Sequence, residues 1–222
     1  VHSGYVYEAL FNPHGNQILT LCEDGAARLV DDTTGATIGK PMVHEAPVRR
    51  AAFSFDGRWI ATASSDRTAR VWDASTGDPA TPPLQHEANV ADVEFNPAGD
   101  TLITASWDRT VRFWDPRNGG ELRPPLKHQD RVNHASFSSD GRRVVTASAN
   151  EARVWDATTG QPLTPVLRHE AEIVVVAFSP DNRYVLSASR DQTARGWSAS
   201  TGAPVSPFLK QRGPITQAVF SP

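Results

Sequence analysis

The stretch Thr104–Asp115, with the sequence TASWDRTVRFWD, decides the fold of this chain. Related stretches occur at Thr62–Asp73 (TASSDRTARVWD), Thr146–Asp156 (TASANEARVWD) and Ser187–Ser198 (SASRDQTARGWS), and a weaker one at Thr20–Asp31 (TLCEDGAARLVD). Each predicts a short strand, a tight turn that contains an acidic or amide residue, and a second strand that closes on Trp-Asp or a variant of it.

Three kinds of residue recur with one period of 42 residues, shortened once to 41. They are the phenylalanines Phe11, Phe53, Phe95, Phe137, Phe178 and Phe220, the histidines His2, His44, His86, His128 and His169, and the tryptophans Trp72, Trp114, Trp155 and Trp197. A shared period of this length is typical of repeat architectures. We therefore expect a single repeat array over residues 1–222, with repeats at about 2–43, 44–85, 86–127, 128–168 and 169–210 and a partial repeat at 211–222.

One repeat predicts four strands and no helix. In the third repeat the runs 90–95, 101–106 and 110–114 are separated by turn sequences, and a fourth run, 122–126, contains Pro124 and Pro125. Proline cannot donate to a strand ladder, so this fourth strand is expected at a sheet edge. Four-stranded antiparallel sheets that must cover each other's faces favour an all-β fold, in which the sheets stack radially as blades of a β-propeller and this chain supplies five full repeats. One extra strand is expected at 215–220.

Composition limits the classes of partner. The net charge is −3 and the pI is about 6.2, so no basic surface indicates nucleic acid or an anionic membrane. A single cysteine, Cys22, and the absence of an apolar run near 20 residues favour a cytoplasmic protein. No charged and then apolar leader follows Val1, so a signal peptide is not expected, and the missing start Met suggests a longer parent or a processed form.

These motifs resemble those of WD40-repeat proteins. The resemblance rests on the histidine about ten residues before each Phe-Asn-Pro or Phe-Ser-Pro type of turn, the turn aspartate and the closing Trp-Asp, and it covers the whole chain. Phrases such as WDASTGDPATPPLQHE and WDATTGQPLTPVLRHE look like bacterial WD40 arrays, which are often joined to kinase, NTPase or protease domains.

The resemblance implies that one His, one Ser or Thr, one Asp and one Trp form a buried hydrogen-bond network in each blade. The complete sets are His44, Thr62, Asp66 and Trp72 in the second repeat, His86, Thr104, Asp108 and Trp114 in the third, and His169, Ser187, Asp191 and Trp197 in the fifth. The first repeat has Val30 in place of Trp, and the turn of the fourth is one residue short and offers only Asn150 or Glu151. The fifth has Gly196 and Ser198 at usually larger or acidic positions, so the first, fourth and fifth blades are expected to be less rigid.

Catalysis, metal binding and cofactor binding are not predicted. A catalytic triad is not repeated once per blade, and the HEAPV-type segments lack the second His of a zinc-binding HExxH motif. The periodic arginines Arg28, Arg70, Arg112, Arg153 and Arg195 are interpreted as contacts between blades.

The resemblance also places partner contacts three and five residues after each His and one residue before the turn Asp. Of these positions the residue types enriched in interfaces select Tyr5, Tyr7, Arg49, Trp107, Arg131, Asn133 and Arg190 as a candidate partner-binding rim. The same mapping also reaches Glu23, Pro47, Ser65, Asn89, Ala91, Glu172 and Val174.

These observations predict a non-enzymatic scaffold that binds an unidentified protein partner. Two alternatives stay open, the regulatory or sensory part of a larger bacterial signalling enzyme and a propeller that binds a small molecule or carbohydrate. Closure is also open: the chain is an excerpt of a larger ring, or it self-associates through open ends, or five blades close alone.

Overall fold

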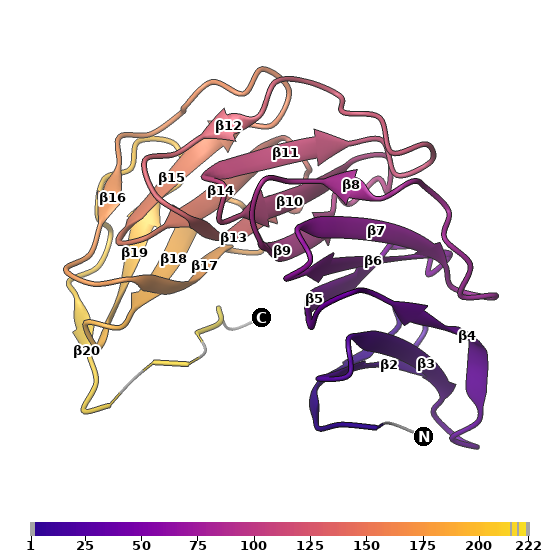
Figure 1. Cartoon of the computed structure of the whole chain (residues 1–222). Helices are drawn as coiled ribbons and strands as arrows, with labels where there is room; N and C mark the ends of the chain where they lie inside the picture. The colour runs from indigo at the N-terminus through magenta and orange to yellow at the C-terminus, as the bar shows by residue number, and fades with distance from the viewer. Residues whose placement is uncertain (1–2, 214, 217, 221–222) are drawn as a thin grey trace. The chain divides into compact units, whose positions relative to one another are not determined.

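The computed structural model describes residues 3–213, 215–216 and 218–220. In this part of the chain every regular element is a β-strand, and the strands form five antiparallel sheets of four strands each (Figure 1). Within each sheet the strands lie side by side in chain order.

The strands of each sheet are as follows. The first sheet contains β1 (Val6–Phe11), β2 (Gln17–Cys22), β3 (Ala26–Asp31) and β4 (Thr37–Val43). The second contains β5 (Val48–Phe53), β6 (Trp59–Ser64), β7 (Thr68–Asp73) and β8 (Leu84–Gln85). The third contains β9 (Val90–Phe95), β10 (Leu102–Ser106), β11 (Thr110–Trp114) and β12 (Leu126–Lys127). The fourth contains β13 (Val132–Phe137), β14 (Arg143–Ser148), β15 (Glu151–Asp156) and β16 (Leu167–Arg168), and the fifth contains β17 (Ile173–Phe178), β18 (Tyr184–Ser189), β19 (Thr193–Ser198) and β20 (Leu209–Lys210).

The chain divides into two compact units. The first unit comprises the described residues up to Asp108 together with Arg112–Arg123. It holds the first two sheets, all of β9 and β10, and most of β11. The second unit comprises Arg109–Val111 and the described residues from Pro124 onward, and it holds the fourth and fifth sheets.

Two predicted strands differ from the structure. The run 122–126 was expected to be the fourth strand of its sheet, but β12 starts only at Leu126, after both prolines. Pro124 and Pro125 have no backbone N–H and therefore precede the ladder instead of joining it. The extra strand expected at 215–220 is wrong for the described residues of that stretch, none of which lies in a strand, and residues 214 and 217 lie outside the description.

Apolar side chains of neighbouring sheets form the core within each unit. Leu19, Leu21 and Leu29 of the first sheet pack with Ile60 and Trp72 of the second. The second sheet packs in the same manner on the third, and the fourth packs on the fifth. Burial of the apolar faces that the sheets direct toward these clusters supplies the main favourable free energy of the fold.

The first sheet leaves one apolar face open. Val6, Ala9 and Phe11 of β1 correspond by repeat to Val48, Ala51 and Phe53, the packed residues of β5, and Phe11 is 64% exposed. Its counterpart Phe95 is only 6% exposed, because the second sheet covers it.

Two glycines allow the backbones of the first and second sheets to touch. Gly39 (φ 66°) in β4 lies against Gly77 (φ 72°) in the loop after β7, and the Lys40 N–H donates to the Thr76 carbonyl at 2.8 Å. A Cβ atom at Gly39 would lie 2.5 Å from the Thr76 carbonyl carbon, and one at Gly77 would overlap the Lys40 carbonyl oxygen. Only glycine fits both the positive φ and the close approach.

Candidate functional site

The second sheet contains a buried chain of side-chain hydrogen bonds. His44 lies before β5, and its ring joins the turn aspartate Asp66 through Nδ1 at 2.8 Å and the Thr62 hydroxyl through Nε2 at 2.7 Å. The Trp72 indole Nε1–H donates to the same hydroxyl at 2.8 Å. The side chains of His44 and Asp66 are 0% and 6% exposed, so water does not compete for these bonds.

The third and fifth sheets repeat this geometry. His86 lies 2.8 Å from Asp108 and 2.7 Å from Thr104, whose hydroxyl accepts from Trp114 at 2.8 Å. In the fifth sheet His169 lies 3.1 Å from Asp191 and 2.7 Å from the Ser187 hydroxyl, which accepts from Trp197 at 2.7 Å. The structure therefore brings together all four members of each of these three sets, and the fifth keeps its network despite Gly196 and Ser198.

One arrangement of protons satisfies every polar atom of this network. The imidazole is neutral, its Nδ1–H donates to the carboxylate, its Nε2 accepts from the hydroxyl, and the hydroxyl oxygen accepts from the indole. A protonated ring would place two hydrogens against that oxygen and would leave the hydroxyl proton without an acceptor. The network thus holds the histidine in one tautomer and one charge state.

The pKa shifts agree with this arrangement. Burial lowers the pKa of His44 and His169 below the ordinary value, although the neighbouring Asp66 and Asp191 act in the opposite sense. Burial alone would raise the pKa of Asp66, but hydrogen bonds from Thr68 and His44 bring it below its usual range. For Asp191 the same balance, with bonds from Thr193 and the Glu170 N–H, gives a pKa of about 2.

Additional hydroxyl groups belong to these networks. Thr68 donates to Asp66 at 2.7 Å and Thr193 donates to Asp191 at 2.6 Å, so each turn carboxylate is held on two sides. The Ser64 hydroxyl is buried, donates to the Ala46 carbonyl and accepts from the Asp66 N–H. These hydroxyl residues were not among the predicted members of the networks. Their signal in the sequence is a Ser two residues before the turn Asp and a Thr two residues after it, which recur in the second, third and fifth copies.

The first sheet uses its turn aspartate differently. Arg28 donates to both carboxylate oxygens of Asp24 at 3.1 and 2.8 Å, and the Ser3 hydroxyl donates at 2.8 Å. The Arg28 hydrogen bonds are the main reason that the pKa of Asp24 lies well below its usual range. His2, the predicted partner, lies outside the described residues.

The fourth sheet lacks the carboxylate. Its hairpin between Ser148 and Glu151 has only two loop residues, Ala149 and Asn150, and the Asn150 amide donates to the His169 carbonyl at 2.8 Å. Trp155 still donates to the Thr146 hydroxyl at 2.8 Å, as in the other sheets. The histidine of this sheet, however, makes no side-chain hydrogen bond to any described residue.

That histidine, His128, packs edge-on against Trp155 with ring centroids 5.3 Å apart, closer than the 5.9 Å between His44 and Trp72. Its Nε2 is buried without a partner in the described part of the chain. Burial, together with the nearby charge of Arg153, lowers the pKa of His128 to about 4. The fourth network therefore contains a neutral imidazole with unused hydrogen-bonding capacity.

The periodic arginines make contacts inside their own sheets. The guanidinium groups of Arg70, Arg153 and Arg195 lie 5.7, 5.5 and 4.8 Å from the ring of the tryptophan two residues later. Arg112 instead pairs with Glu121 at 3.4 Å. These contacts lie within one sheet, as expected when a strand places residues i and i+2 on one face, so the interpretation of the four arginines as contacts between blades stays a prediction.

In the first unit two of the predicted rim residues touch. The Arg49 guanidinium lies 4.7 Å from the Trp107 ring centroid, and its Nε donates to the Ser65 hydroxyl at 2.8 Å. Trp107 is half-buried by this packing. Tyr5 is 69% exposed and Tyr7 is 39% exposed, so both present an aromatic ring to solvent.

In the second unit three predicted rim residues meet at one carboxylate. Glu172 accepts from Arg131 at 3.0 Å and from Asn133 at 2.7 Å through Oε1, and from Arg190 at 2.8 Å through Oε2. The side chains of Arg131 and Arg190 are 48% and 68% exposed, so their pairs with Glu172 lie at the surface. Glu172 was among the mapped positions but was not selected, because acidic residues are depleted in interfaces.

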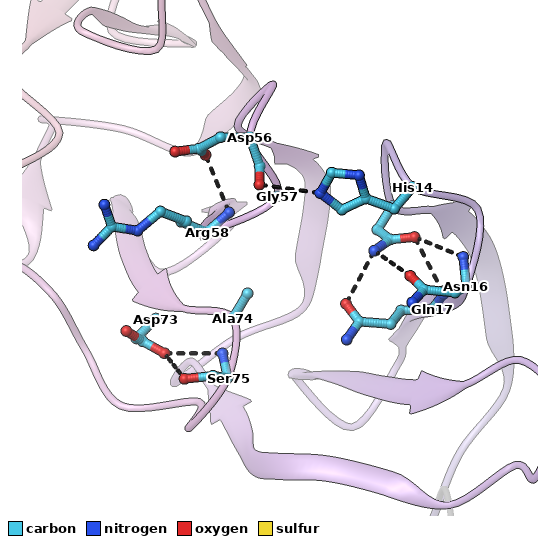
Figure 2. A pocket seen from close by; sticks show the side chains of 10 residues that line it. His14, Asn16, Gln17, Asp56, Gly57, Arg58, Asp73, Ala74 and Ser75 are labelled. Carbon is cyan, nitrogen blue, oxygen red and sulfur yellow. Dashed lines mark hydrogen bonds between the residues drawn. The ribbon is translucent and has the colours of Figure 1, made fainter.

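A polar cavity of about 420 Å³ lies at the turns of the first and second sheets. Figure 2 shows His14 directed toward the Asp56–Gly57 turn, with Arg58, Asp73 and Ser75 on the far side. The His14 Nε2 lies 3.3 Å from the Asp56 carbonyl oxygen. No tryptophan, tyrosine or phenylalanine lines this cavity, so it lacks the aromatic surface on which a sugar ring would stack.

Metal binding and membrane spanning find no support in the described residues. No three His, Cys, Asp or Glu side chains come together as a metal-binding group there, and Val48 of the HEAPV segment starts β5 instead of continuing a helix. Within the same residues no helix is long and apolar enough to cross a bilayer.

Comparison with known proteins agrees with this geometry. Residues 37–73, 81–115, 121–156 and 160–198 match the family model described as "WD domain, G-beta repeat". The structure is similar to the crystal structure of the computationally designed Ika8 protein, with a TM-score of 0.89 and 23% sequence identity, over 100% of this chain and 67% of the designed one. No curated protein matches by sequence. Because the matched segments span more than half of its length and each carries the Trp-containing hairpin described above, the chain belongs to the WD40-repeat family.

Proposed function

We propose that this chain is a non-enzymatic WD40 module that binds a protein partner through the rim residues Tyr5, Tyr7, Arg49, Trp107, Arg131, Asn133 and Arg190. WD40 repeats generally serve as protein-interaction scaffolds. The observation that carries the proposal is the placement of large aromatic and guanidinium side chains at loops and strand starts of both units, where the core does not require them. Tyrosine, tryptophan and arginine are the residue types that dominate binding free energies in protein interfaces.

The rim of the first unit is suited to such a role. The Arg49–Trp107 pair is pre-organised by the Ser65 hydrogen bond, so little side-chain entropy is lost when a partner covers it. The hydrogen-bonded triads of His, Ser or Thr and Asp are, in contrast, assigned to folding. Their hydroxyl groups are fully buried and already bound to Trp and His, which supports a structural role for them.

A matched pair of variants tests this proposal. Trp107→Ala removes an aromatic side chain at the β10–β11 turn. Phe55→Ala removes one that is 77% exposed at the β5–β6 turn, which lies at the other end of the strands from the β6–β7 turn that corresponds by repeat to β10–β11. Proteins captured by cross-linking to the whole chain should be lost with Trp107→Ala or Arg190→Ala and kept with Phe55→Ala. Equal capture by all variants would show that the rim residues do not bind the captured proteins.

Self-association through open sheet faces is a further part of the proposal. Its support is the exposure of Phe11 at 64% and of Leu209, in β20, at 55%, where the counterparts Leu84 and Leu167 are 1% exposed. Light scattering after size exclusion measures this directly: a discrete multiple of 24.1 kDa is expected, and a stable species at 24.1 kDa would contradict it. A cytoplasmic location, a five-repeat array and a bacterial multidomain parent remain proposals that rest on sequence alone.

A further inference from the structure

The fourth sheet contains a cavity where its network is incomplete. The cavity has a volume of about 280 Å³, and its lining includes Lys127, His128, Glu151, Arg153 and Arg168. It lies beside the shortened β14–β15 hairpin, whose missing residue would carry the turn aspartate of the other sheets.

The histidine in this lining has lost both of its usual partners. His44, His86 and His169 each join one carboxylate and one hydroxyl, whereas His128 joins neither. An imidazole ring always carries at least one N–H, and a buried N–H without an acceptor lowers stability. The ring is therefore a ready donor for an acceptor that enters the cavity.

The charges around the cavity favour an anion. Lys127, Arg153 and Arg168 contribute three positive charges, and Glu151 contributes one negative charge. The Glu151 carboxylate is held 2.7 Å from Arg168 and does not reach His128. Arg153 also has a buried Nε without a hydrogen-bond partner among the described residues.

We propose that this cavity binds a carboxylate group, which accepts a hydrogen bond from the His128 ring and pairs with the cations of the lining. The bound group takes the role that Asp66, Asp108 and Asp191 play in the other networks. Charge-assisted hydrogen bonds offset the desolvation of a carboxylate when several donors converge on it. The carboxylate belongs either to a small free acid or to an Asp or Glu side chain of a bound polypeptide, and the inference does not depend on the rim proposed above.

The first test is an NMR titration of the whole chain with sodium acetate. The four ring signals of His44, His86, His128 and His169 are followed through their Cε1–Hε1 groups. We expect a saturable shift of the His128 signal alone, since the other three rings already hold a carboxylate. Acetamide, which has nearly the same shape without the charge, and sodium chloride at equal ionic strength should leave His128 unchanged.

A blocked tripeptide, acetyl-Gly-Asp-Gly-amide, distinguishes the two sources of the carboxylate. Tighter binding of the tripeptide than of acetate assigns the site to an acidic side chain of a partner, and tighter binding of acetate assigns it to a free acid. The absence of a saturable His128 shift with either probe, or an equal shift with acetamide, would overturn the proposal.

Two variants give a readout that does not use the His128 signal. Saturation transfer to the acetate methyl group measures the affinity for acetate. This affinity should be about tenfold lower for His128→Gln, as expected for the loss of one charged hydrogen bond. Insertion of one Asp between Ala149 and Asn150 restores the turn length of the other sheets and should abolish acetate binding, because the cavity then holds its own carboxylate. Undiminished binding in a folded insertion variant, judged by unchanged His44, His86 and His169 signals, would contradict the site.

Discussion

The second and fourth sheets present the same strand order around two different polar centres. In the second, His44 is fixed between Asp66 and Thr62, and all polar atoms of the chain from Asp to Trp are used. In the fourth, the deletion of one turn residue removes the carboxylate, and His128 moves toward Trp155 and leaves Thr146. The sheet forms in both cases, so the strand ladder and the apolar faces suffice for the fold, and the network adds stability and a fixed charge state to it.

The largest expected effect comes from removing the hydroxyl that joins two partners. Thr62→Val should lower the free energy of unfolding by about 2–5 kcal/mol, because both His44 Nε2 and Trp72 Nε1 lose their hydrogen bond to this hydroxyl. The equivalent change in the fourth sheet, Thr146→Val, strands only Trp155 and should cost about 1–3 kcal/mol. Urea unfolding of both variants measures the difference, and equal losses would mean that His44 gains nothing from Thr62.

Acid should destabilise the fourth sheet through His128. Its folded pKa of about 4 lies below the unfolded value near 6.5. The neutral ring therefore contributes fully to the free energy of unfolding above pH 6.5, and this contribution is lost as the pH falls toward 4, because the unfolded chain binds a proton that the buried ring does not. The full shift corresponds to roughly 3 kcal/mol. Unfolding free energies measured between pH 7 and 4 should fall less steeply for His128→Gln than for the parent chain.

The control for this pH profile is Thr146→Val, which keeps the imidazole and should keep the slope. A profile of His128→Gln that is parallel to that of the parent chain would assign the acid sensitivity to other groups.

The shortened hairpin should gain from a glycine. Ala149 has a φ of 49°, in the left-handed region that costs a residue with a Cβ about 1–2 kcal/mol, so Ala149→Gly should raise the unfolding free energy by about 1 kcal/mol. The matched change Ala152→Gly, in the adjacent strand β15, should lower it, because a strand glycine loses packing and chain entropy. The same sign for both changes would show that the turn is not strained.

The smallest effect on stability is expected at the rim. Trp107→Ala exposes no buried polar group and should change the unfolding free energy by about 1 kcal/mol or less, while Arg49 loses its ring contact. Thermal unfolding compares this variant with Thr104→Val, which breaks the buried network three residues earlier in the same sheet. A loss at Trp107 as large as that at Thr104 would place the indole in the core and would remove it from the binding surface.

Much of this molecule is readable from the sequence because its chemistry is repeated. The period of Phe, His and Trp predicts four-stranded sheets, and the family matches confirm the resemblance to WD40 repeats. The residues expected in three networks do lie within hydrogen-bonding distance of one another. The prediction that Pro124 and Pro125 lie in the fourth strand was wrong, because β12 starts after both prolines, as β8 starts after Pro82 and Pro83.

The sequence does not predict where side chains lie when one copy departs from the repeat. A missing turn residue is visible in the fourth copy, but the shift of His128 onto Trp155 depends on how the neighbouring side chains refill the space. The meeting of Arg131, Asn133 and Arg190 at Glu172 joins residues from three segments, and no spacing in one segment encodes it. The first feature arises from a deletion within one copy, and the second arises from contacts between two copies that have diverged.

The backbone contact between Gly39 and Gly77 bears on how such an array evolves. Repeats that duplicate and recombine are interchangeable only if every junction accepts every neighbour. The first copy carries Gly39, but the second, third and fifth copies carry Thr81, Arg123 and Ser206 at that place. The later junctions accept a side chain at that place, since Thr81 lies beside Gly119 and Thr164 lies beside Gly202, the counterparts of Gly77. The glycine four residues after the closing Asp, or Ser198 in the fifth copy, is therefore the part of the junction that every copy retains, and copies can be exchanged as long as it is kept.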